Sequence, residues 1–355
     1  MTLVFTLLTP HYVLQVSDRR LTRRPDGAIH PLANKSVIYA TRRGVAAIGY
    51  SGLAYFKGVP TDTWIACALA GEDPQSDHDG LRMSSPPTPL PDLGQSVERL
   101  RSQCEGLFGT ARKLPDRQQF TVAGWQWNRS GRRMRPVFWN IENGEPSAER
   151  RTFTTVSPPR HWHVQQGGYY LSWIPDLNPL CGDEIQRLMQ LLAPVASSPV
   201  VSNTLLIRAI RYAAQKGGLH GPVGPDCMSI YLPKPSKEPR VVACYFPLVE
   251  SRAVLQSSAG QVILPSAYSP WVVTPSLFQV PSLVVGGFHL GPGPEMRWLS
   301  GPIPPPQPLA GSPPDPVTNL DIVIASPFVP QGVAVRFAST TLRPPSDPSG
   351  GRSPE

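Results

Sequence analysis

The stretch of sequence that decides the fold is TLVFTLLTPHYVLQVSDRRLT, residues 2–22. Two β-rich runs, 2–8 and 12–16, flank Thr9-Pro10-His11. Apolar runs of this length around a proline-containing turn are typical of a β-hairpin. The chain is therefore predicted to begin with two paired strands, and the polar segment 17–22 follows the second of them.

This N-terminal stretch does not have the features of a signal peptide. No basic leader precedes Leu3, Thr6 and Pro10 interrupt the apolar pattern, and no small-residue cleavage site precedes Asp18. The longest apolar runs elsewhere, 64–70 and 241–246, are far shorter than the ~20 residues that a membrane-spanning helix needs. We therefore expect a cytoplasmic protein without a membrane partner.

Beyond the hairpin, blocks of strand patterns alternate with pairs of helical patterns. The strand patterns lie at 35–41, 44–50, 118–127, 135–141, 227–232 and 240–246. The helical patterns begin at Thr61 and cover 93–112, 183–192 and 201–215. This order predicts an α+β protein built as a four-layer αββα sandwich, and it disfavours a Rossmann-type fold.

The last part of the chain differs in composition, so we divide the sequence into a domain at 1–250 and a Pro-rich extension at 251–355. The five Arg and five acidic residues of the extension cancel, and the net charge of +8 therefore lies in the first 250 residues. The extension is predicted to hold a few short strands and a disordered tail. Its predicted features are strands within 267–275, 282–290 and 321–336, a hairpin turn at Pro330-Gln331-Gly332, a linker at 302–316 and the tail at 344–355.

The basic balance does not indicate a nucleic-acid partner. The arginines occur mostly as pairs beside turns, and no aromatic-interleaved RNA-binding motif accompanies them, so a solvated surface explains the charge. The five cysteines are widely spaced and form no CxxC or Cys/His ligand pattern. We expect free thiols, no metal and no cofactor.

Chemistry is suggested by Thr2. Removal of Met1 would leave a threonine with a free α-amine, which combines a hydroxyl nucleophile and a base in one residue. An unperturbed α-amine titrates at about 7.7–8.0, and a neighbouring cation would lower that pKa further. Lys35 is the candidate cation, and Asp18 is the candidate partner that holds it.

These residues carry a resemblance to the proteasome β-subunit family, which includes the bacterial HslV protease, within the N-terminal-nucleophile (Ntn) hydrolases. In that family an Asp and an Arg follow the nucleophilic Thr by sixteen and eighteen residues, as Asp18 and Arg20 follow Thr2. A Lys precedes the oxyanion-hole Gly by fourteen residues, as Lys35 precedes Gly49. Similar strand motifs at 120–126 and 136–144, and Asp226-Cys-Met-Ser229, extend the similarity over residues 2–246.

The resemblance implies a threonine peptidase or amidohydrolase with a peptide or amide substrate. Thr2 would attack the carbonyl, Lys35 held by Asp18 would lower the pKa of the amine, and the Gly49 amide would stabilise the oxyanion. Asp226 and Ser229 would support the amine, and Arg20 would be structural. The family assembles into rings, so the resemblance also implies a homo-oligomer and a possible unfoldase partner.

Two alternatives are compatible with the same residues. The segment QQGGY at 165–169 lacks the Ser that the family has in a Gly-Ser-Gly motif, which favours a catalytically inactive assembly or binding protein on the same fold. Asp18, Arg20 and Lys35 could instead form a surface ion-pair set, and Gly49 could be an ordinary turn glycine.

Overall fold

The structure is a computed structural model of the whole chain, and it describes most of the first 246 residues and four short stretches beyond them. The described ranges are 2–22, 29–30, 34–41, 43–56, 58–71, 81–82, 92–108, 118–127, 134–143, 153–156, 168–174, 180, 182–218, 221–234, 240–246, 271–273, 278–279, 319–326 and 329–338. The predicted linker at 302–316, the tail at 344–355 and most of the QQGGY segment lie outside them.

A seven-stranded sheet contains the N-terminal hairpin. Its order is β13-β1-β2-β14-β15-β18-β19, and all its neighbours are antiparallel except β15 and β18. The strands are β1 (Val4–Leu8), β2 (Tyr12–Asp18), β13 (Tyr170–Ile174), β14 (Cys227–Pro233), β15 (Arg240–Phe246), β18 (Asn319–Ser326) and β19 (Val329–Ala338). The predicted hairpin is confirmed, with Val4 opposite Ser17 and Leu8 opposite Val13.

A second sheet has eight strands in the order β12-β11-β10-β6-β5-β16-β17-β9, in which only β5 and β16 are parallel. These strands are β5 (Ser36–Thr41), β6 (Gly44–Ser51), β9 (Leu81–Arg82), β10 (Gln119–Trp127), β11 (Met134–Asn143), β12 (Phe153–Val156), β16 (Trp271–Val273) and β17 (Phe278–Gln279). The described residues also form two short two-stranded ribbons. One pairs β3 (Leu21–Thr22) with β4 (Ile29–His30), and the other pairs β7 (Tyr55–Phe56) with β8 (Val59–Pro60).

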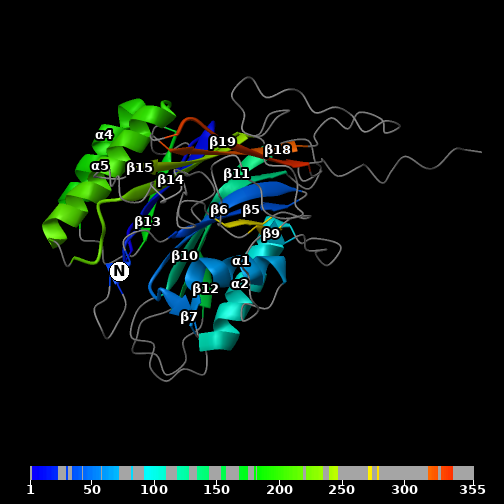
Figure 1. Ribbon diagram of the computed structural model, residues 1–355. Coiled ribbons are helices and arrows are strands. Elements are labelled where there is room, and N and C mark those ends of the chain that lie inside the picture. The colour runs from blue at the N-terminus through cyan, green and yellow to red at the C-terminus, as the bar shows by residue number, and fades with distance from the viewer. Residues whose placement is uncertain are drawn as a thin grey trace, which may run out of the picture.

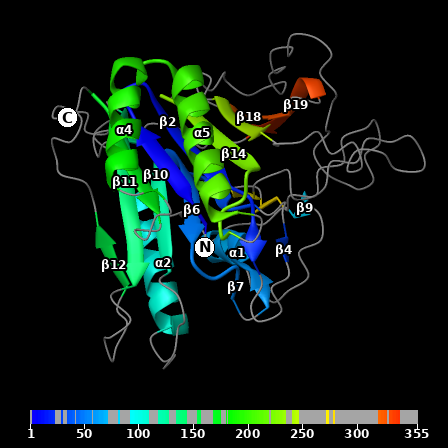
Figure 2. The ribbon, with the colours of Figure 1, turned by 90° about the vertical axis from the view of Figure 1, so that its left-hand side faces the viewer.

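Each sheet is covered by its own pair of helices. Helices α1 (Thr61–Ala70) and α2 (Leu93–Phe108) share a hydrophobic core with the eight-stranded sheet. Helices α4 (Gly182–Leu192) and α5 (Pro199–Gly217) share another core with the seven-stranded sheet, and the short 3₁₀ helix Ala193–Val195 joins them. Figures 1 and 2 show the two pairs on opposite sides of the strands.

The helix boundaries follow local chemistry. Helix α2 begins after Asp92, which exchanges hydrogen bonds with Gln95 in a capping box. Helix α1 ends at Gly71, whose left-handed φ of 79° is a conformation that glycine adopts without strain. Among the described residues, no helix has both the length and the apolar character needed to cross a membrane. The predicted α+β class, with largely antiparallel sheets, is confirmed.

The strands of the 251–355 segment join both sheets. Trp271 pairs with Val37 of β5, and Val323 pairs with Val242 of β15. The predicted turn at Pro330-Gln331-Gly332 is wrong, because the chain turns between Ser326 and Val329 and these residues lie within β19. Since β19 is an edge strand, a proline near its start costs the sheet no central hydrogen bond.

Candidate functional site

The N-terminal end of the chain is packed between the two sheets. Thr2 precedes β1 and is only 3% exposed. Leu3 belongs to the core beneath α4 and α5, whereas a Cβ on Gly49 of the other sheet would lie 3.0 Å from Val4 Cγ1. Leu3 and Val4 therefore face opposite layers, and the Thr2 carbonyl oxygen contacts Ser51 of the eight-stranded sheet.

Asp18 ends β2 and lies directly beside Leu3. Its backbone N–H donates to the Leu3 carbonyl oxygen at 3.1 Å, and its Oδ1 accepts from the Leu3 N–H at 2.8 Å. Its Oδ2 accepts from the backbone N–H groups of Arg20 and Gly224, each at 3.0 Å. The carboxylate is fully buried, and these donors hold it in one orientation.

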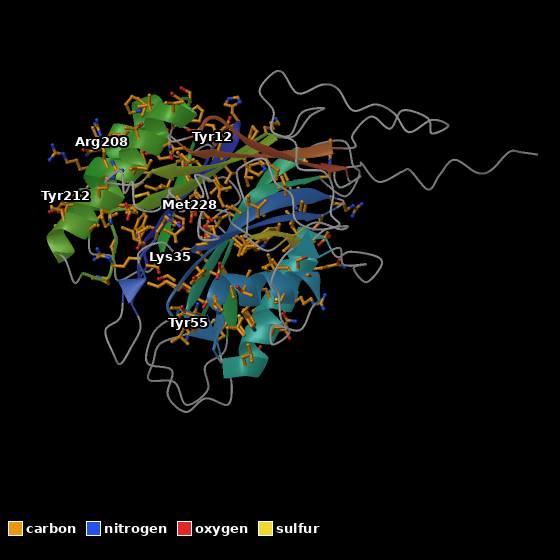
Figure 3. The ribbon with its side chains drawn as sticks, in the orientation of Figure 1. Tyr12, Lys35, Tyr55, Arg208, Tyr212 and Met228 are labelled. Atoms are coloured by element: carbon orange, nitrogen blue, oxygen red, sulfur yellow. The ribbon has the colours of Figure 1, made fainter. Side chains whose placement is uncertain are left out.

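Lys35 supplies the positive charge at the site. Its Nζ lies 2.9 Å from Asp18 Oδ2 and also donates to the Arg20 carbonyl oxygen, and both side chains of the ion pair are 0% exposed. Burial lowers the pKa of Lys35, the Asp18 carboxylate opposes that shift, and the charges of Arg20 and Arg19 add to the lowering. Figure 3 shows Lys35 inside the molecule, near the N-terminal end of the chain.

Arg20 connects the site to the segment that precedes β14. Its guanidinium donates to the Gly221 carbonyl oxygen at 2.9 Å. A Cβ on Gly224 would lie 2.7 Å from Arg20 Cβ, so the close approach of these two segments requires glycine at position 224. Arg20 therefore connects the segment that follows β2 with the segment that precedes β14.

The end of β6, in the eight-stranded sheet, contacts Thr2 and Lys35. Gly49 is paired with Ser36 on one side and Thr121 on the other, so its backbone N–H lies in the plane of the sheet. The Tyr50 N–H donates to the Lys35 carbonyl oxygen at 3.2 Å. Ser51 ends the strand, and its hydroxyl donates to the Thr2 carbonyl oxygen at 3.0 Å. Gly52 follows with φ 117°, beyond the ladder.

The remaining predicted residues lie on β14 or next to it. Asp226 directly precedes the strand, at the level of Asp18, because Cys227 pairs with Asp18. Ser229 pairs with Val16, a residue of the core beneath the helices, so alternation directs its side chain toward α5 and away from Thr2. Within the described residues, hydrogen bonds join Asp18 to Lys35, to the Arg20 amide and to the Leu3 amide, and alternation places Ser229 on the sheet face that α5 covers.

Sequence reasoning missed Ser51, Gly224 and Asp62. The first two act through contacts between segments that are distant in sequence, which local patterns do not reveal. Asp62 lies in the first turn of α1 and is 8% exposed, and burial raises its pKa from 3.8 to about 7. The neighbouring Tyr50 has its pKa raised by burial and then by the charge of Asp62, while its hydroxyl donates to the Asn34 carbonyl oxygen.

Metal chemistry has no visible site in the part of the chain that the structure describes, where no three His, Cys, Asp or Glu side chains gather as ligands. Cys67, Cys104 and Cys227 are buried free thiols. Burial raises the pKa of the Cys227 thiol, which disfavours its reactive thiolate form.

Comparison with known proteins gives weak structural matches. No family model matches the sequence, and no curated protein matches it. The Anbu (Gly-1) mutant from Hyphomicrobium sp. strain MC1 aligns with a TM-score of 0.41 and 11% identity, over 65% of this chain and 80% of that chain. Anbu (ancestral beta-subunit) from Yersinia bercovieri aligns with a TM-score of 0.41 and 10% identity, over 66% of this chain and 81% of that chain. The helical assembly of the Anbu complex from Pseudomonas aeruginosa aligns with a TM-score of 0.37 and 11% identity, over 71% of this chain and 88% of that chain.

These matches correct the family assignment made from the sequence. The three solved structures named above are Anbu proteins, not HslV or proteasome subunits, so the assignment to the proteasome β-subunit and HslV family is wrong. One part of that spacing, the interval from Thr2 to Asp18, reflects the length of the first hairpin, which places Asp18 beside Leu3. TM-scores this low do not carry an activity from those proteins to this chain.

Proposed function

We propose that this protein is an N-terminal threonine hydrolase, which cleaves amide bonds with Thr2 as nucleophile after removal of Met1. One observation carries the proposal: the two oxygens of Asp18 bind the Leu3 amide and the Lys35 ammonium group respectively. Asp18 thereby links the buried Lys35 ammonium group to the peptide N–H that follows Thr2. The two sheets with their outer helices would then form the four-layer αββα sandwich of an Ntn hydrolase.

The mechanism follows from the charges at the site. A positive Lys35 beside the α-amine of Thr2 would lower the pKa of that amine, so that more of it is neutral near pH 7. The neutral amine would take the proton of the Thr2 hydroxyl as Oγ1 attacks the substrate carbonyl, and would return it to the leaving amine. Asp18 would keep Lys35 in place, with Arg20 holding the loop around it. Asp226, which directly precedes β14, would support the Thr2 amine.

The oxyanion donor in this proposal is the amide of Gly52 rather than that of Gly49. The Gly49 N–H is directed at a neighbouring strand, whereas Gly52 follows the end of β6 beside Ser51, which contacts Thr2. Loss of one oxyanion-hole donor costs roughly 2.7–4 kcal/mol of transition-state stabilisation where a side-chain donor has been removed. Ser229 would support the sheet rather than the proton transfer.

The test is covalent capture of the nucleophile. Intact mass should show a chain that starts at Thr2, and a β-lactone or peptide epoxyketone should add once, at Thr2. Thr2→Ser should keep the labelling and Thr2→Ala should lose it, while Thr41→Ala, a buried threonine at the far end of β5, serves as the matched control. Retention of Met1 in the purified protein, or equal labelling of Thr2→Ala, would refute the proposal.

A second candidate function is supported by the burial of Thr2. A residue that is 3% exposed offers little access to a substrate, which favours a catalytically inactive assembly or binding protein on the same fold. That candidate predicts a defined oligomer by light scattering and no labelled nucleophile. A peptide or amide substrate, self-association into a homo-oligomer and an unfoldase partner remain predictions from the sequence.

A further inference from the structure

The peptide bond between Thr2 and Leu3 is held at both of its polar groups. Its N–H donates to Asp18 Oδ1 at 2.8 Å, and its carbonyl oxygen accepts from Ser51 Oγ at 3.0 Å. Asp18 belongs to β2 of the seven-stranded sheet, whereas Ser51 belongs to β6 of the eight-stranded sheet. The two sheets therefore clamp one peptide plane from opposite sides.

This clamp matters because a terminal residue is attached to the chain on one side only. Once Met1 is removed, the Thr2–Leu3 peptide is the single covalent connection of Thr2, and chain ends without such restraints are usually poorly ordered. The orientation of this peptide plane sets the direction in which the Thr2 amine and Oγ1 point. Displacement of a reacting group by about 1 Å can reduce a rate by about a hundredfold.

We infer that Ser51 is a positioning residue, which fixes the orientation of Thr2 by donating to its carbonyl oxygen. The inference deepens the proposed function and rests on it. Ser51 is 1% exposed and Thr2 is 3% exposed, so removal of the hydroxyl leaves a buried acceptor without this donor. The peptide plane then keeps the hydrogen bond from the Leu3 N–H to Asp18 Oδ1.

The experiment compares Ser51→Ala with Ser51→Thr and with Ser202→Ala. Ser51→Thr keeps the hydroxyl. Ser202 is a matched control because it is also fully buried and its hydroxyl is hydrogen-bonded, to Tyr12 and the Val195 carbonyl oxygen, in the helix layer. Two readouts are used: the rate constant and affinity for capture of Thr2 by a β-lactone, and hydrogen exchange at the Leu3 amide.

Ser51→Ala should slow the capture step about ten- to a hundredfold with little change in probe affinity, and should speed exchange at the Leu3 amide several-fold. Ser51→Thr should recover the capture rate, and Ser202→Ala should keep both values near those of the wild type. Equal capture and exchange in Ser51→Ala and wild type would overturn the inference, as would equal losses in Ser51→Ala and Ser202→Ala.

The two proposals fail in different ways. If wild-type protein is not captured at all, the proposed hydrolase function fails, but the exchange measurement still tests the clamp on the unlabelled protein. If wild-type protein is captured and Ser51→Ala behaves identically, only the positioning role of Ser51 fails.

Discussion

Two lysine–carboxylate pairs in this protein have the same separation and opposite surroundings. Lys35 and Asp18 lie 2.9 Å apart with both side chains 0% exposed, and Lys216 and Glu184 lie 2.9 Å apart on the outer surface of α5 and α4 with 39% and 24% exposed. Figure 3 shows the contrast, since Lys35 is internal whereas Tyr212, which also contacts Glu184, projects from α5. Distance alone therefore does not define what an ion pair does.

Burial makes the difference. Water screens the outer pair, and such pairs contribute about 0–1 kcal/mol to stability. The inner pair has lost its hydration, so each charge depends on its partner and on the surrounding backbone donors. The inner pair is therefore costly to assemble and strongly coupled to anything that changes it, which suits a site where one group must alter the pKa of another.

The largest effect is expected for Lys35→Met, which removes the cation paired with the buried Asp18 and keeps its backbone donors at Leu3, Arg20 and Gly224. Breaking a buried pair on one side costs about 3–5 kcal/mol, and loss of assistance to the base should slow capture of Thr2 at least about a hundredfold. Urea unfolding and β-lactone labelling measure the two effects. Unfolding and labelling curves that coincide with those of wild type would show that the pair neither stabilises the fold nor serves catalysis.

Asp62 sharpens the comparison because it is a buried carboxylate without a salt-bridge cation among the described residues. Its folded pKa of about 7 exceeds its ordinary value of 3.8, so its contribution to stability is present below about pH 4 and is lost as the pH rises through 7. At about 1.4 kcal/mol per pKa unit, Asp62→Asn should stabilise the protein by up to about 4 kcal/mol at pH 8 relative to pH 4.

The control for that prediction is Asp183→Asn, which changes an exposed first-turn aspartate of α4. Denaturant unfolding between pH 4 and 8 should show a pH-dependent gain for Asp62→Asn and no comparable gain for Asp183→Asn. A gain for Asp62→Asn that does not vary with pH would contradict the assignment.

Gly224→Ala tests the backbone donors that keep Asp18 in place. The added Cβ would lie 2.7 Å from Arg20 Cβ, so the loop must shift and the Gly224 N–H must move away from Asp18. Loss of one hydrogen bond to a buried carboxylate should cost about 1–3 kcal/mol. Thermal unfolding measures it, with Gly182→Ala as control because a Cβ there meets nothing within 4 Å. Equal melting temperatures for the two variants would rule out a strained loop.

The smallest effect is expected on the outer surface. Lys216→Met removes the partner of Glu184 and the cation above the Tyr212 ring, yet it should change the free energy of unfolding by no more than about 1 kcal/mol and leave Thr2 labelling unchanged. Urea unfolding at low and high salt measures it. A loss comparable to that of Lys35→Met would mean that burial is not what separates the two pairs.

Much of the fold could be predicted from the sequence, because strand alternation and helical periodicity are local signals. The hairpin of residues 2–16, β5 and β6, and α1, α4 and α5 all lie where their patterns indicate. The turn of β18 and β19 was misplaced, because Pro330 and Gly332 resemble a turn but lie in an edge strand. Pairing of residues 271–273 with β5 could not be foreseen, since nothing in a short apolar run specifies a distant partner.

The sequence predicts the intervals between the site residues, but not the contacts that the two sheets make at the site. The interval between Thr2 and Asp18 follows from hairpin length, and Lys35 lies beside Asp18 because β5 begins there. Contacts between the sheets, such as Ser51 with Thr2, depend on how the two layers pack, and no spacing encodes them. The same limitation explains the incorrect family assignment, because residue intervals report strand lengths and not descent.

The parallel pairs β5–β16 and β15–β18 set an order for biosynthesis. Val37 can pair with Trp271, and Val242 with Val323, only after the later residue of each pair has been synthesised. Until then the two sheets lack strands. Contacts this far apart in sequence form slowly, and incomplete sheets leave unpaired strand edges that are prone to aggregate. The strands of residues 4–18 are thus synthesised early, but the two sheets that contain and face them reach their full width only after residues 271–338 have emerged from the ribosome.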